Sequence, residues 1–271
     1  MPTDRQPGRE EPGDRRRAPA LKLARDTWLT FQYESGQLMH NPVNIALSLI
    51  QPVTFLLLFT PFLKSVMGAS SYGDAYRIYV PSLFCAMGVF SGLFAGFALI
   101  AAIRQGVIAR FRVTPVSRVG LLLGRELMFV ALVGFQAVII AVVALVFGLR
   151  VPPLNLLLAL VLLSLMVIIG VSISNVLAIF VPNVNVLLNV TNGVTEPIAL
   201  LAGVLIPLSV APLWVRDVAQ WNPFAWGANG MRAAFQGHLG AQVVWEAGAI
   251  LAALAAVAVV ASSRLFTREI A

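Results

Sequence analysis

The sequence predicts an all-α integral membrane protein with six transmembrane helices. Apolar residues occupy 59% of its 271 positions, charged residues only 11%, and the mean hydropathy is +0.86. Soluble domains carry about 25% charged residues, so this chain could not cover a water-exposed surface. A bilayer-spanning helix needs about 20 apolar residues, and six windows meet that length. These windows are residues 43–63, 78–103, 127–149, 155–180, 187–207 and 243–263.

The chain divides into a predicted cytoplasmic arm at residues 1–20 and a transmembrane domain at residues 21–271. The arm is rich in Arg and Pro and contains almost no large apolar side chain, which is typical of disorder. It lacks the pattern of a cleaved signal peptide, so we expect it to be retained. A nucleic-acid-binding arm is an alternative, although basic residues beside a membrane segment more often fix topology.

A short amphipathic helix is predicted between the arm and the first span. Its apolar residues recur at helical spacing, and its charged residues fall on other faces. We expect it to lie in the inner membrane interface and to end at Asn41-Pro42. The apolar residues are Leu21, Ala24, Trp28, Phe31 and Leu38.

The distribution of Lys and Arg predicts the orientation in the cell membrane. With six spans, both termini lie on one side, and placing them in the cytoplasm puts fourteen basic residues inside and five outside. This excess agrees with the positive-inside rule. Four tryptophans then fall in the last outer region, where an interfacial aromatic belt is expected. They are Trp214, Trp221, Trp226 and Trp245.

The outer segment 208–240 is too apolar for a plain loop and too interrupted for a span. We expect Pro207, Pro212 and Pro223 to divide it into two short helices that re-enter the outer leaflet.

The connection 104–125 is the largest inner loop, and it is basic and partly helical. Thr114-Pro115 has the residue types that begin a helix. The segment could be a solvated basic loop or a helix that docks on another protein, and the residue pattern leaves both open. Arg110, Arg112 and Arg118 would face the cytoplasm beside Phe111 and Val113.

Two segments resemble the ABC-2 type permeases, in particular drug-export permeases of the daunorubicin-resistance type. The first is Gly106-Val107-Ile108 with the run from Arg110 to Arg118. The second runs from Ala202 to Leu208 and continues in Trp221-Asn222-Pro223-Phe224 and Arg232. In that family the second of these segments is an outer re-entrant structure, which implies this role for Pro207, Asn222, Pro223 and Arg232.

The resemblance implies a homodimeric permease that works with two copies of an ATPase subunit and exports a hydrophobic or amphipathic substrate. The loop after the second span would be the coupling helix that enters a cleft of the ATPase. Its coupling residues would be Ile108, Arg110, Phe111, Arg112, Val113, Thr114, Pro115 and Arg118.

A phosphate-binding P-loop ends in Gly-Lys-Ser/Thr. Neither lysine of this chain, Lys22 or Lys64, follows a glycine. We therefore expect no enzymatic activity here, with ATP and Mg²⁺ held by a separate ATPase chain.

The fifth window carries a polar stripe on one helical face, formed by Asn185, Asn189, Asn192 and Glu196. A central acid facing lipid costs roughly 3 kcal/mol, so the stripe should face protein or water. Three readings stay open: hydrogen bonds to the fourth span, a translocation pathway, or proton coupling through Glu196. The partners in the first reading would be Ser172, Ser174 and Asn175.

Gly88, Gly92 and Gly96 form a small-residue ladder in the second window, which favours close helix packing within one subunit over a dimer seam. His40 and His238 fall on opposite sides of the membrane and offer no metal site, and no catalytic arrangement is evident. Two other functions remain as alternatives: a permease for polysaccharide or glycolipid, and a proton-coupled transporter, which would show inverted repeats.

Overall fold

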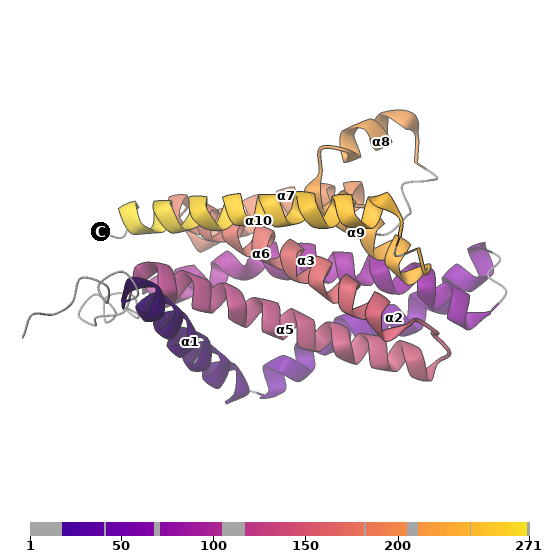
Figure 1. Ribbon diagram of the computed structural model, residues 1–271, viewed down its shortest axis with the longest axis horizontal. Coiled ribbons are helices and arrows are strands. Elements are labelled where there is room, and N and C mark those ends of the chain that lie inside the picture. Colours follow the sequence, from indigo (N-terminus) through magenta and orange to yellow (C-terminus); the bar gives the residue numbers. More distant parts are fainter. Residues whose placement is uncertain are drawn as a thin grey trace, which may run out of the picture.

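The computed structural model describes residues 18–40, 42–67, 71–104, 117–181, 183–204, 211–238 and 240–269. Regular structure in these ranges is helical, and the long helices form an elongated bundle (Figure 1). The helices are α1 (Ala18–Met39), α2 (Pro42–Met67), α3 (Tyr72–Arg104), α5 (Arg118–Val146), α6 (Pro153–Phe180), α7 (Val184–Leu201), α8 (Leu213–Ala219), α9 (Pro223–Phe235) and α10 (Gln242–Glu269).

Five helices are long and apolar enough to cross a membrane, namely α2, α3, α5, α6 and α10. They coincide with five of the six predicted windows and indicate a multi-pass membrane protein. The remaining window, 187–207, corresponds to α7, which has 18 residues and is not among these five. Residues 205–210 lie outside the described part, so the sixth span stays a prediction.

The predicted inner connection 104–125 was too long at its C-terminal end. α5 begins at Arg118 rather than near 127, and the backbone N–H of Gly120 donates to Ser117, the residue that caps it. Arg125 was assigned to the loop because it is charged, but it is a buried helical residue with 7% exposure. Burial disfavours the charged guanidinium of Arg125, and attraction by the carboxylate of Glu34 on α1 offsets part of this cost.

The centre of the bundle is the crossing of α3 and α6. A Cβ added at Gly92 would lie 2.9 Å from the Cα of Gly170, so the two backbones touch at this point. Gly88 and Gly96 likewise face Leu163 and Ser174 of α6. The glycine ladder therefore serves packing within one chain, as its spacing indicates.

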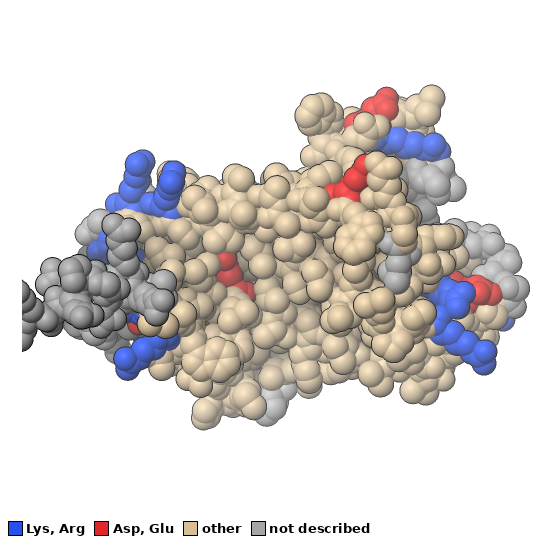
Figure 2. Space-filling view, viewed as in Figure 1, with Lys and Arg blue, Asp and Glu red and all other residues tan. Residues whose placement is uncertain are grey.

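The start of α1, the start of α5 and the C-terminus lie at one end of the bundle, which we call the inner end (Figure 1). The α2–α3 and α5–α6 connections lie at the opposite, outer end. On the face shown in Figure 2, charged side chains gather mainly toward the two ends, and the surface between them is mostly uncharged apart from a small acidic patch. This pattern is the one expected of a bundle whose middle lies in hydrocarbon.

Candidate functional site

The inner end of α5 is joined to α1 by polar contacts and close packing. The backbone N–H of Ser117 donates to Asp26 Oδ2 at 2.8 Å. Gly120 and Gly124 allow the approach, since a Cβ added at Gly124 would lie 2.5 Å from the Cβ of Thr30. A helix, α1, is present where the amphipathic helix was predicted, but the residues that it buries are the polar Asp26 and Thr30, and its place in the membrane interface stays a prediction. Its apolar residues Leu21 and Trp28 remain exposed on this chain.

Arg118, the first residue of α5, links this end of the helix to α10, the last helix of the chain. Its Nη1 donates to the backbone oxygen of Thr267, near the end of α10, at 3.2 Å. Arg118 is therefore the one predicted coupling residue in the described part, and it lies where α1, α5 and α10 meet. The other coupling residues fall within 105–116, outside the described residues, and stay predictions: Ile108, Arg110, Phe111, Arg112, Val113, Thr114 and Pro115.

The polar stripe of α7 lies on the open side of that helix. Its four residues, Asn185, Asn189, Asn192 and Glu196, are all exposed. A separate stripe along α7 is buried, and this helix packs mainly on α3. The buried stripe consists of Leu187, Thr191, Thr195 and Ala199.

The fourth-span residues suggested as partners for this stripe are engaged elsewhere or have no partner. Ser172 donates to Glu126 Oε1 at 2.8 Å, and Ser174 donates to the backbone oxygen of Leu93. The side-chain amide of Asn175 forms no hydrogen bond. Within one copy, the polar stripe is therefore not satisfied by α6.

The outer segment contains the two predicted short helices, α8 and α9, and α9 is anchored in the bundle. Asn222 caps α9 by accepting from the N–H of Phe224 at 3.1 Å. Its Nδ2 donates to the backbone oxygen of Ile198 at 2.8 Å, which links α9 to α7, and Pro223 occupies the first turn. Pro207 lies outside the described residues, and re-entry into the membrane stays a prediction.

Arg232 of α9 extends this anchor to α3. Its Nη2 donates to Ser82 at 3.2 Å and to the backbone oxygen of Gly203, where α7 has ended. Gly203 has a φ of +71°, a left-handed conformation that glycine adopts without strain. Burial lowers the pKa of the Arg232 guanidinium from its ordinary value. Arg232 thus holds α3, α7 and α9 together near the outer end.

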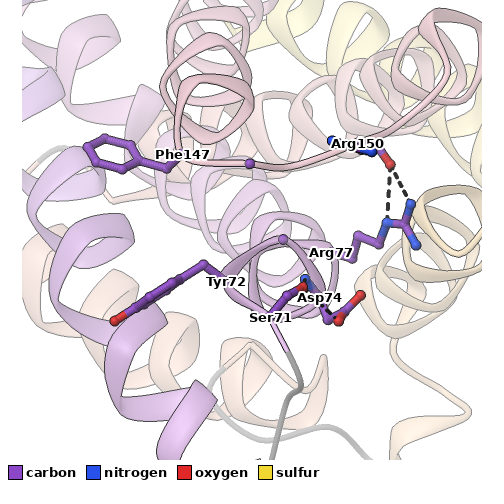
Figure 3. Close-up of a pocket in the computed structure, with 8 residues that line it drawn as sticks. Ser71, Tyr72, Asp74, Arg77, Phe147 and Arg150 are labelled. Carbon is purple, nitrogen blue, oxygen red and sulfur yellow. Dashed lines mark hydrogen bonds between the residues drawn. The ribbon is translucent and has the colours of Figure 1, made fainter.

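A pocket of about 430 Å³ lies where the outer start of α3 meets the α5–α6 connection (Figure 3). Arg77 donates to the backbone oxygen of Arg150 from Nε at 3.1 Å and from Nη2 at 2.7 Å. Ser71 donates to Asp74 Oδ2 at 2.7 Å in the first turn of α3. The two hydrogen bonds of Arg77 hold the α5–α6 connection against α3.

The sequence analysis missed the buried polar residues of α1 and α5. Asp26 and Thr30 are 6% and 4% exposed, and Glu126 is 3% exposed. A usable signal was present, because Gly120 and Gly124 form a small-residue pair that permits close approach. In the described ranges, no group of His, Cys, Asp and Glu residues could hold a metal ion.

These features define a multi-pass helical membrane protein in which the start of α5 is tied to the first helix, α1. Residues 25–235 match the ABC-2 type transporter family, and the chain belongs to this family. The membrane domain of that family is a transport component without catalytic activity of its own, and it generally works with an ATPase subunit. No match was found among curated proteins.

Proposed function

We propose that this chain is the membrane subunit of an ATP-driven exporter and that two copies form its translocation unit. The observation that carries the proposal is the exposed polar stripe of α7. A helix face with three amides and a carboxylate is costly in lipid. If a second copy lay across a water-filled pathway, the stripe would face water instead of lipid and the cost would disappear. This arrangement would place Glu196 beside the substrate.

The ATPase subunit would dock on the inner loop 105–116 and hold ATP and Mg²⁺. Family membership supports this partner, and so does the junction of α1, α5 and α10 that Arg118 occupies. We infer cytoplasmic termini and a plasma-membrane location from the excess of basic residues on that side. A hydrophobic or amphipathic substrate of the drug-like or lipid-like class fits a pathway bordered by apolar helices.

The direct test is reconstitution of the chain with an ATPase from the same cell in sealed vesicles. We expect co-purification and ATP-dependent movement of an amphipathic dye across the bilayer. Phe111→Ala or Arg112→Ala should reduce transport per ATP hydrolysed while membrane insertion stays normal. Transport that depends on a pH gradient and does not depend on ATP would contradict the proposal. If a glycolipid is exported and the dye is not, the proposed substrate class is wrong but the ATP-driven mechanism still holds.

A further inference from the structure

A small apolar cluster near the inner end joins five helices, one of them through Leu187 of α7. It contains Leu99 and Ile100 of α3, Leu122 of α5, Ala178 of α6 and Phe266 of α10. Residues three or four positions apart lie on the same face of a helix. On α5, α6 and α10, the residues one turn outward from this cluster therefore lie on the same helix faces that meet in it.

Three of these outward neighbours are polar and buried. They are Glu126, four residues after Leu122, Asn175, three before Ala178, and Ser262, four before Phe266. Their exposed fractions are 3%, 0% and 0%. Together with Ser172, the hydrogen-bond partner of Glu126, we call them the inner polar layer.

Hydrogen bonding in the inner polar layer is incomplete. Ser172 donates to Glu126 Oε1, but Asn175 Nδ2 and Oδ1 and Ser262 Oγ have no protein partner. Asn155, which is also buried on α6, shows the usual arrangement, because its Nδ2 donates to the backbone oxygen of Ala234 at 2.7 Å. Buried polar atoms are rarely left unpaired in folded proteins, so the layer points to a small bound ligand.

We propose that the inner polar layer is an internal water site, in which bound water bridges Asn175, Ser262 and the carboxyl of Glu126. The unpaired atoms include a donor, Nδ2, and an acceptor, Oδ1, and water can serve both. A metal cation would satisfy only the oxygens and would lie beside an N–H donor. Buried waters typically form about three hydrogen bonds, which this layer supplies.

The site is independent of the proposed transport function. Its consequence is mechanical, because α5, α6 and α10 are linked by water rather than by direct hydrogen bonds. Water can change partners as helices shift by small distances, whereas direct side-chain bonds would have to break. The apolar cluster at Leu122 and Phe266 closes the layer on its inner side.

The first test is a high-resolution cryo-EM map of the full chain in lipid nanodiscs. We expect solvent density within hydrogen-bonding distance of the Asn175 amide and the Glu126 carboxyl. Direct bonds from Asn175 to Glu126 or Ser262, with no solvent density, would overturn the proposal. Sodium chloride, compared with choline chloride, should leave the melting temperature unchanged. A sodium-dependent rise that Glu126→Gln abolishes would assign a cation instead.

The second test compares two asparagines on one helix by thermal unfolding. Asn155→Leu should lower the melting temperature by several degrees, because it leaves the Ala234 oxygen unpaired. Asn175→Leu should lower it similarly, since it removes two partners of the bound water. A dry layer predicts the opposite result for Asn175→Leu, a higher melting temperature. Ser262→Ala provides a milder variant, for which a decrease supports the water site and an increase argues against it.

Discussion

Asp26 of α1 accepts a hydrogen bond from the backbone N–H of Ser117, 91 positions further along the chain, at 2.8 Å. Ser117 is the first described residue after the predicted coupling loop, and it caps α5. Asp26 is 6% exposed, so water competes weakly for this bond. A displacement of the loop must therefore move α1 with it or break this contact.

Replacing Asp26 with alanine should weaken the junction between α1 and α5. A hydrogen bond to a carboxylate contributes about 1.5–3 kcal/mol, so the melting temperature should fall. If the proposed function is right, transport per ATP should fall as well, because loop motion would no longer reach α1. Arg25→Ala, at the exposed neighbouring position, is the control and should change neither quantity. Unchanged stability in Asp26→Ala would mean that the junction does not depend on this bond.

A second prediction concerns the close packing of the same helices. Gly124→Ala should destabilise the protein, because the new Cβ would lie 2.6 Å from the backbone oxygen of Thr27. Gly134→Ala on the same helix meets no atom within 4 Å and should be neutral or stabilising by up to about 1 kcal/mol. Thermal unfolding of both variants in detergent compares the two sites. Equal melting temperatures would show that α1 can move away from α5 at little cost.

The orientation can be checked by cysteine labelling in intact cells. The native Cys85 has 0% exposure and should stay unreactive. Cysteine at Trp221, which is 90% exposed and predicted to lie outside the cell, should react with an impermeant thiol reagent. Cysteine at Arg268, exposed near the C-terminus, should react only after the membrane is permeabilised. The reverse pattern would overturn the orientation inferred from the basic residues.

Much of the fold could be predicted from sequence because lipid imposes a length and a hydropathy on each span. Five windows became α2, α3, α5, α6 and α10 for this reason. Hydropathy does not predict the start of a span correctly where a charged residue is buried against another helix. Arg125 was read as a loop residue, because hydropathy cannot register its attraction to Glu34.

The candidate site was less predictable from sequence, because its contacts join residues that lie far apart along the chain. The helical period placed the α7 stripe on one face, and the structure shows that face open. Periodicity could not show that α7 packs on α3 rather than on α6. Nor could it pair Asp26 with Ser117, since no local pattern links residues of α1 and α5.

The remaining prediction concerns Glu196. Glu196→Gln should change the rate of transport or the range of substrates several-fold and leave the melting temperature nearly unchanged. The side chain is exposed on a single copy, and surface substitutions usually alter stability by less than about 0.5 kcal/mol. Its charge, by contrast, would act directly on a substrate in a pathway between two copies.

Glu246→Gln is the matched control for this charge change. Glu246 is an exposed acid on α10 that accepts a hydrogen bond from Gln242, and it lies outside the α7 stripe. We expect normal transport in this variant. If Glu196→Gln is equally silent, the stripe serves contact between copies and not passage of substrate. If it abolishes transport together with any dependence on a pH gradient, Glu196 carries protons and the ATP-driven mechanism fails. Dye transport in vesicles with an imposed pH gradient, with and without ATP, separates these outcomes.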